Sequence, residues 1–278
     1  MKTLIRNVII IFVFIISFNC KIVKPANVIF SNTEIPYEKV SFQTNDGVML
    51  SGMLIHSPES KAIIICLHVY KGNKDETLPL VSFLYPDFSL FLFDFRAHGE
   101  SEGDIIYFGL KEYLDVKAAI DFLKNEERTK NLKIGIWGCS LGASVGIIAS
   151  SKYEEIKCLV ADSGFANISD TITFYSEKLG SGKNIFASVA TFLVESIFKY
   201  DLIENSPENC IDKVTCPVLI IHSKEDEIIP FSHAEILYNK VKGEKELFVI
   251  DGKHAVQKVR YSQGYRDKVK EFFCKYLQ

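Results

Sequence analysis

Residues 133–150 read KIGIWGCSLGASVGIIAS and join a short apolar run, a glycine-flanked serine and a run of small residues. Residues 133–137 predict a buried strand, and residues 141–150 predict a helix. Ser140 stands between them in the pattern GCSLG, residues 138–142. A Gly-x-Ser-x-Gly order is typical of a sharp strand-to-helix turn that exposes a nucleophile, where the helix N-terminus supplies partial positive charge. We therefore predict that Ser140 is a nucleophile; a tight turn that happens to hold a serine is the alternative.

The same pattern occurs a second time, as GESEG at residues 99–103. Ser101 lies there between Glu100 and Glu102, and negative neighbours oppose a developing alkoxide or oxyanion. Residues 104–109 read as a loop, so no helix starts directly after this serine. We expect Ser101 to be structural.

The rest of the chain alternates between strand and helix patterns. Residues 37–44 and 48–56 alternate apolar and polar positions around NDG, a hairpin turn signal. Strands that alternate with helices imply right-handed crossovers and parallel pairing. We expect an α/β fold with a mostly parallel central sheet, an antiparallel N-terminal hairpin and helices on both faces. The apolar runs are residues 62–67, 90–95, 133–137, 156–161, 218–221 and 247–250, and the helical stretches are residues 111–123, 141–150, 233–241 and 267–277.

Residues 165–213 interrupt this alternation, because they contain helical material but no strand pattern. We predict a small helical cap inserted into a domain that covers residues 36–278; a long ordinary crossover is the alternative. The cap carries several aromatic residues, which either pack in its own core or line an apolar pocket for an acyl group. These are Phe165, Phe174, Tyr175, Phe186, Phe192 and Phe198.

Composition and charge exclude several classes of function. With 278 residues and a net charge of −3, the chain has no basic surplus for nucleic acid. No metal-binding or phosphate-loop motif occurs, so no metal or other cofactor is expected. Seven cysteines are too few for a disulfide scaffold, and only Cys210 and Cys216 flank a short stretch that allows pairing. The oligomeric state is left open.

The N-terminus has the features of an export signal. Lys2 and Arg6 precede an apolar run over residues 8–18, which is shorter than the roughly 20 residues of a membrane-spanning helix. Cys20 follows directly, and this order resembles the lipobox of bacterial lipoproteins, in which the cysteine is lipidated. We expect a signal peptide over residues 1–19, a tether over residues 20–35 and an exported, membrane-attached protein. An uncleaved membrane anchor or ordinary secretion is the alternative.

Candidates for a base and an acid follow Ser140 in the chain. His254 lies in a loop directly after the last apolar run, and Asp226 lies directly after the run at residues 218–221. In a serine–acid–histidine order, His254 would take the serine proton, and Asp226 would hold the imidazole tautomer. Asp162, at the end of the preceding strand, is the competing acid. His68 and His222, which end strands, are expected to be structural.

Together these motifs resemble the α/β-hydrolase superfamily, in its esterase and acyl-peptidase-like serine-hydrolase branch. The resemblance runs from about residue 37 to the C-terminus through His68, DFRAHGES at residues 94–101, the Ser140 turn, DEIIP at residues 226–230 and GKH at residues 252–254. It implies the fold expected above and a structural role for the turn at residues 94–101.

The same resemblance implies an oxyanion hole of two backbone N–H groups. One is that of Leu141; the other lies in the loop after the third strand and aligns with Tyr70. Val69 replaces the usual glycine in this loop, which restricts the backbone if an unusual φ is needed there.

We predict a serine hydrolase that cleaves a carboxylic ester, thioester or amide of a small acyl substrate through an acyl-enzyme on Ser140. An acyl group of lipid-like character fits a cap rich in aromatic residues. The alternatives are an acyltransferase that uses the same three residues, a serine peptidase and a non-catalytic binding protein of the same fold. Hydrolases with a carboxylate nucleophile are disfavoured by Ser140.

Overall fold

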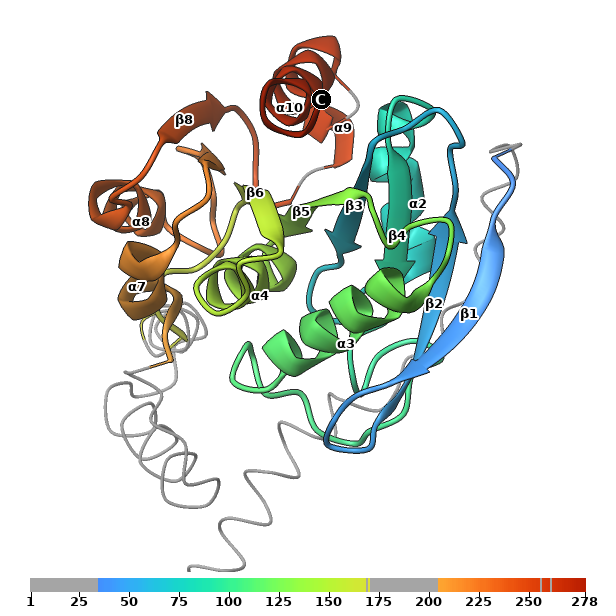
Figure 1. Ribbon diagram of the computed structural model, residues 1–278. Helices are drawn as coiled ribbons and strands as arrows, with labels where there is room; N and C mark the ends of the chain where they lie inside the picture. The colour runs from blue at the N-terminus through green and yellow to red at the C-terminus, as the bar shows by residue number, and fades with distance from the viewer. Residues whose placement is uncertain (1–34, 169, 171–204, 256, 261) are drawn as a thin grey trace, which may run out of the picture.

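The structure is a computed structural model that describes residues 35–168, 170, 205–255, 257–260 and 262–278. Within these residues an eight-stranded sheet has the order β1-β2-β4-β3-β5-β6-β7-β8 (Figure 1). The pairs β1–β2 and β2–β4 are antiparallel, and all other pairs are parallel. The predicted fold class is thereby confirmed. The strands are β1 (Glu38–Gln43), β2 (Met49–Ile55), β3 (Ala62–Leu67), β4 (Ser89–Phe93), β5 (Lys133–Cys139), β6 (Ile156–Asp162), β7 (Val218–Ser223) and β8 (Lys245–Ile250).

Helices cover both faces of the sheet (Figure 1). One face packs against α3, α4, α7 and α8, and the opposite face packs against α2 and α10. The described helices are α2 (Lys74–Val81), α3 (Glu112–Asn125), α4 (Leu141–Ser150), α7 (Pro207–Cys210), α8 (Ser232–Lys240), α9 (Gln257–Arg260) and α10 (Gln263–Leu277), with short 3₁₀ turns at Ser82–Leu84 and Ile211–Lys213.

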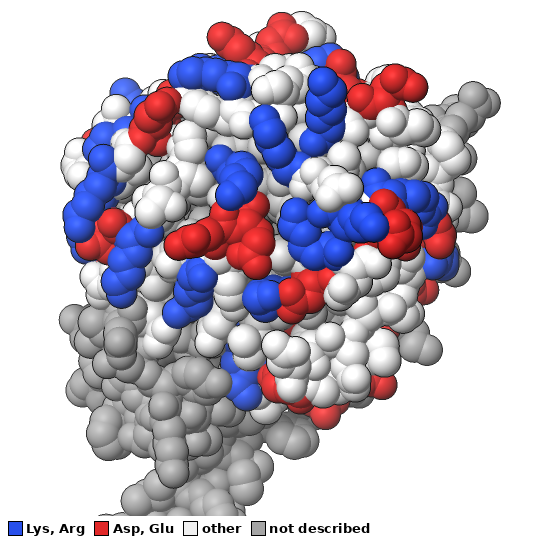
Figure 2. All heavy atoms as spheres, viewed as in Figure 1, with Lys and Arg blue, Asp and Glu red and all other residues white. Residues whose placement is uncertain are grey.

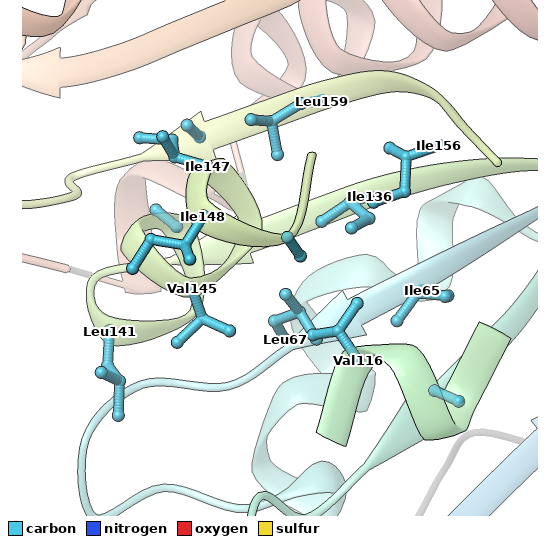
Figure 3. Packing of buried hydrophobic residues seen from close by; sticks show 14 of the residues in the cluster. Ile65, Leu67, Val116, Ile136, Leu141, Val145, Ile147, Ile148, Ile156 and Leu159 are labelled. Carbon is cyan, nitrogen blue, oxygen red and sulfur yellow. The ribbon is translucent and has the colours of Figure 1, made fainter. Parts of the chain in front are cut away.

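The central strands are apolar on both sides because both of their faces are covered. In β5, Ile136 points into the core on the α4 face, where Leu159 and Val145 also pack, whereas Trp137 joins the core on the α10 face (Figure 3). Both side chains are fully buried. This explains why the strands were recognisable as continuous apolar runs.

Parallel pairing brings the carboxyl ends of neighbouring strands to one edge of the sheet. Leu67 at the end of β3 pairs with Gly138 in β5, and Cys139 pairs with Asp162 at the end of β6. The loops after β3, β5, β6, β7 and β8 therefore start from the same edge, where ligands bind in open α/β sheets.

The structure also departs from the sequence-based predictions in several elements. Helix α2 was not predicted, because Pro79 lies inside it; its start is capped by the Asn73 side chain, which accepts from the Glu76 N–H. Helix α10 begins at Gln263, four residues earlier than expected, where Ser262 caps it. Cys210 and Cys216, which the sequence allowed to pair, do not form a disulfide.

Two predicted segments lie outside the described residues. The leader, Cys20 and nearly all of the tether belong to residues 1–34, and most of the predicted cap belongs to residues 171–204. These assignments stay predictions. In the described part of the chain, no helix combines the length and the apolar character needed to cross a membrane. On the face viewed in Figure 2, acidic and basic side chains are interspersed.

Candidate active site

The turn around Ser140 is sharp, and its two glycines make it possible. Ser140 has φ 54° and ψ −114°, a strained conformation for a residue with a side chain. A Cβ on Gly138 would lie 2.3 Å from the Gly142 carbonyl oxygen, and one on Gly142 would lie 2.3 Å from the Leu67 carbonyl oxygen. Only glycine fits at either position, so β5 and α4 can meet closely at the serine.

The structure brings Ser140, His254 and Asp226 together in one hydrogen-bonded chain. His254 Nε2 lies 2.9 Å from Ser140 Oγ, and His254 Nδ1 lies 2.6 Å from Asp226 Oδ2. Because an ionised carboxylate only accepts, Nδ1 carries the proton, and Nε2 is left to accept from the serine hydroxyl. The His254 side chain is 9% exposed and that of Asp226 is 0% exposed, so little water competes for these bonds.

Asp226 is held in its ionised form by several donors. Its Oδ1 accepts from the backbone N–H groups of Ile228 and Ile229, at 2.9 and 2.8 Å. Burial raises the pKa of Asp226, but hydrogen bonds with His222 and His254 lower it by more, so the pKa lies well below its usual range. His222 itself donates from Nε2 to the Ile229 carbonyl at 2.8 Å, as a structural histidine.

Asp162, the competing acid, is occupied elsewhere. Its Oδ2 accepts from the Tyr265 hydroxyl and its Oδ1 from Arg260 Nη2, both at 2.7 Å. The hydroxyl of Ser163 also donates to Oδ1, at 2.8 Å. The carboxylate that contacts the His254 imidazole is therefore that of Asp226.

The loop after β3 begins against the Ser140 turn. A Cβ on Gly142 would lie 2.8 Å from the His68 carbonyl oxygen, so the two segments are in close contact. The positive φ of this loop belongs to Lys71, at 60°, and not to Val69. The concern that Val69 would need an unusual φ was therefore wrong. Tyr70 packs its ring 5.1 Å from that of Phe108.

His68 is structural, as predicted from its position. Its Nδ1 donates to the Val69 carbonyl at 2.7 Å, and its Nε2 accepts from the Phe95 N–H at 3.0 Å. Burial, reinforced by His98, lowers the pKa of His68 to about 3, so this imidazole is neutral and serves to fix the loop.

The second serine motif lies in a different environment. Ser101 Oγ donates to the Asp94 carbonyl at 2.6 Å and accepts from the Ser51 N–H at 2.9 Å. Both functions of this hydroxyl are used by the backbone.

Two features near the site were missed by sequence reasoning. Arg260 and Tyr265, which bind Asp162, are buried at 1% exposure each. Nothing in the polar stretch KVRYSQ, residues 258–263, marks this arginine as buried. Tyr265 could have been found from the sequence. If Ser262 is taken as the N-cap, α10 starts four residues earlier than expected, and Tyr265 then lies in the first turn of the helix. Among the described residues, no group of three or more His, Cys, Asp or Glu side chains is placed to hold a metal ion.

The sheet order, the strained serine turn and the loops at one sheet edge define an α/β-hydrolase. Residues 107–278 match the prolyl oligopeptidase family (peptidase S9), and the chain belongs to this family. It is a hydrolase of the esterase or peptidase type.

Individual proteins are similar to this chain over most of its length. The protein YfhR of Escherichia coli strain K12 is 31% identical over 252 residues, which cover 86% of this chain and 81% of YfhR. YqkD of Bacillus subtilis is 32% identical over 216 residues, which cover 76% of this chain and 70% of YqkD. Among solved structures, the esterase Pf2001 of Pyrococcus furiosus superposes with a TM-score of 0.75 at 27% identity and covers 93% of this chain and 98% of its own. The acylaminoacyl peptidase of Pyrococcus horikoshii shares the fold, with a TM-score of 0.65 at 21% identity over 87% of this chain and 41% of its own.

Proposed function

We propose that this protein is a serine hydrolase that cleaves carboxylic esters through an acyl-enzyme on Ser140. The observation that carries the proposal is the chain of contacts from Asp226 to His254, at 2.6 Å, and from His254 to Ser140, at 2.9 Å. A nucleophile, a base and an orienting acid in this geometry are the parts that acyl transfer needs.

In the proposed reaction, His254 Nε2 takes the proton of the Ser140 hydroxyl as Oγ attacks the carbonyl carbon. The backbone N–H groups of Leu141 and Tyr70 stabilise the oxyanion; the helix N-terminus at Leu141 supports this role. The imidazolium, stabilised by Asp226, gives its proton to the departing alcohol. Water then attacks the acyl-enzyme with His254 again as base, which releases the acid and restores Ser140.

Ester hydrolysis is favoured over amide hydrolysis for two reasons. An alcohol is a better leaving group than an amine, so esters ask less of the acid step. The similarity to the Pyrococcus furiosus esterase, at 27% identity over nearly the whole chain, supports the same choice. The family match supports a second candidate, a serine peptidase with the same residues. Acyl transfer to an acceptor other than water is a variant of the same mechanism.

The acyl group is proposed to be apolar, with lipid-like character. The half-buried rings of Tyr70 and Phe108 pack against the core beside the loop after β3, and the predicted cap adds further aromatic residues. Lipidation of Cys20, or an uncleaved anchor, would keep the enzyme at a membrane close to such substrates.

A panel of p-nitrophenyl esters with increasing acyl length tests this proposal on the purified full-length protein. Ser140→Ala is the blank, and peptide p-nitroanilides form the peptidase arm. We expect ester turnover that disappears in the variant, and labelling of the wild type alone by a fluorophosphonate. Labelling of Ser140→Ala would refute the nucleophile, and faster cleavage of the anilides would favour the peptidase. Added alcohol or amine that appears in the product would indicate a transferase.

A further inference from the structure

His254 lies in a loop whose surface contacts are weak. This histidine loop, residues 251–255, follows β8. Its Gly252 N–H donates to Glu225, and Lys253 pairs with Glu227 at 3.0 Å with side chains 70% and 50% exposed. Exposed contacts of this kind contribute little to holding a segment in place, because solvent screens them.

The inner side of the histidine loop is not densely packed. A cavity of about 90 Å³ is lined by Ala255 and Arg260 together with Trp137 and Cys139 of β5. Side chains that border a void lose the dispersion contacts that fix a packed segment. Ala255 also has a φ of 52°, which costs free energy for a residue with a side chain. Ala255 and Val259 pack partly against the core on this face. Because the cavity beside them leaves this apolar contact incomplete, packing alone does not fix the distance between His254 and Ser140.

Arg260 supplies a buried connection between the two sides of the site. It follows His254 by six positions in the chain, and its Nη2 donates to Asp162 Oδ1 at 2.7 Å and to Cys139 Sγ at 3.1 Å. Both partners adjoin the nucleophile: Cys139 precedes Ser140 in the chain, and the Asp162 carbonyl accepts from the Ser140 N–H at 2.8 Å.

The acceptor side of this connection is itself rigidly held. Asp162 Oδ2 accepts from the Tyr265 hydroxyl at 2.7 Å, and that hydroxyl accepts from Trp137 Nε1 at 3.0 Å. All of these side chains are buried to within a few per cent. Charge-assisted hydrogen bonds in such a low-dielectric setting are strong and directional.

We propose that Arg260 is a positioning residue that sets the distance between His254 and Ser140. By tying the segment after the histidine loop to the two residues beside the nucleophile, it aligns the base across the cavity. The role in catalysis rests on the proposed function; the anchoring itself does not. A misplacement of the base by about 1 Å costs on the order of 100-fold in rate, which is the scale of effect expected when the anchor is lost.

The test compares Arg260→Met and Arg260→Lys with Arg96→Met in the full-length protein. Arg96 is a matched control, because it is 3% exposed and pairs with Asp115 at 2.6 Å far from the histidine loop in sequence. Rates are expressed per active site titrated with a fluorophosphonate, which removes unfolded molecules from the comparison. We expect kcat to fall about 100-fold in Arg260→Met, with KM changed less than about 3-fold. In Arg260→Lys, which keeps the charge but not the guanidinium fork, the fall should be about 10-fold.

Arg96→Met should unfold more easily yet keep kcat within about 3-fold of the wild type, since its loss disturbs folding and not alignment. An unchanged kcat in Arg260→Met, or an equal loss in Arg96→Met, would overturn the proposal.

Amide hydrogen exchange provides a second test that needs no substrate. Exchange at residues 251–260 should accelerate at least about 10-fold in Arg260→Met and not in Arg96→Met. If exchange does not accelerate, Arg260 does not anchor the histidine loop. If the wild-type protein has no hydrolase activity, the proposed function is refuted, and the hydrogen-exchange result still tests the anchoring by Arg260.

Discussion

The two Gly-x-Ser-x-Gly segments of this chain have one pattern and two outcomes. The hydroxyl of Ser101 is hydrogen-bonded to the backbone on both sides: it donates to the Asp94 carbonyl and accepts from the Ser51 N–H. Ser140, held at φ 54°, presents its hydroxyl to the His254 imidazole. The pattern therefore specifies a tight glycine-flanked turn, and the partners that surround the turn determine what its serine does.

The glycines of the two segments differ in the same way. Gly99 has φ 51°, and a Cβ there would lie 2.2 Å from Asp94 Oδ2, so this glycine makes room for a buried carboxylate. Gly142 makes room for the Leu67 carbonyl oxygen, and thus for the close approach of the loop after β3. In the first segment the space accommodates an ion-pair network; in the second it accommodates the sharp turn that holds Ser140.

Exchange of each serine for alanine gives the largest contrast. Ser140→Ala should lower kcat/KM by about four to six orders of magnitude, because the nucleophile is gone. Ser101→Ala should leave activity within a few-fold and cost about 1–3 kcal/mol of folding free energy, since two backbone groups lose their partner. Ester hydrolysis and urea unfolding of both variants measure this. Loss of catalysis in Ser101→Ala with intact folding would contradict the contrast.

Each segment also depends on one carboxylate. Asp226→Asn should lower kcat about 10⁴-fold, because the amide no longer enforces the Nδ1–H tautomer of His254. Asp94 accepts from the backbone N–H and Nζ of Lys74, both at 2.7 Å. Asp94→Asn should therefore destabilise the fold by about 3 kcal/mol, and its remaining folded fraction should stay active. Steady-state rates per titrated site distinguish the two outcomes. A severe rate defect in folded Asp94→Asn would show that the segments are not separable.

Acid should lower the folding stability through Asp46, which pairs with Arg96 close to the Ser101 segment in the chain. The hydrogen bond from Arg96 lowers the pKa of Asp46 from 3.8 to about 2. The folded state thus favours the ionised form, and its contribution to stability is complete above about pH 4 and is lost as the pH falls through about 2. Urea midpoints at pH 5, 3 and 2 should fall more steeply in the wild type than in Asp46→Asn. Glu59→Gln, at an exposed site, is the control, and its urea midpoints should follow those of the wild type. If the midpoints of Asp46→Asn fall with pH as steeply as those of the wild type, Asp46 does not contribute to the acid sensitivity.

The smallest effect is expected at Glu100, beside Ser101. Its carboxylate accepts from Lys74 Nζ at 2.8 Å, but its side chain is 51% exposed. Glu100→Gln should change the free energy of unfolding by less than about 1 kcal/mol and leave kcat/KM unaltered. Thermal unfolding and ester hydrolysis suffice as measurements. A rate change of ten-fold or more would indicate that the charge acts on the site at a distance.

Sequence reasoning reached the sheet and the three side chains of the proposed active site because each has a local signature. The runs at β3, β5 and β7 are apolar on both faces, and Gly138 and Gly142 can be recognised from their spacing around Ser140. Asp226 and His254 follow β7 and β8, and the carboxyl ends of parallel strands lie at the same edge of the sheet. Helix α2 was missed because Pro79 reads as a helix breaker, although the Asn73 cap and the acidic first turn marked its start.

Other features have no local signature at all. Arg260 can be buried because its guanidinium pairs with the carboxylate of Asp162, which lies nearly a hundred positions earlier in the chain. The positive φ in the loop after β3 belongs to Lys71, a residue type that gives no hint of such a conformation. Contacts that depend on tertiary partners of this kind follow from the assembled sheet and not from any window of sequence.

The position of β8 at the rim of the sheet bears on how the protein becomes active during synthesis. β8 pairs with β7 alone among the described strands, and His254 comes after it. A ribosome therefore finishes every buried strand, and the serine turn with them, before it delivers the imidazole. A chain that stops before residue 254 would lack the proposed proton acceptor and also α10, whose Val269 and Phe273 belong to the core on one face of the sheet. The proposed chemistry and that part of the interior therefore both wait for residues that follow β8.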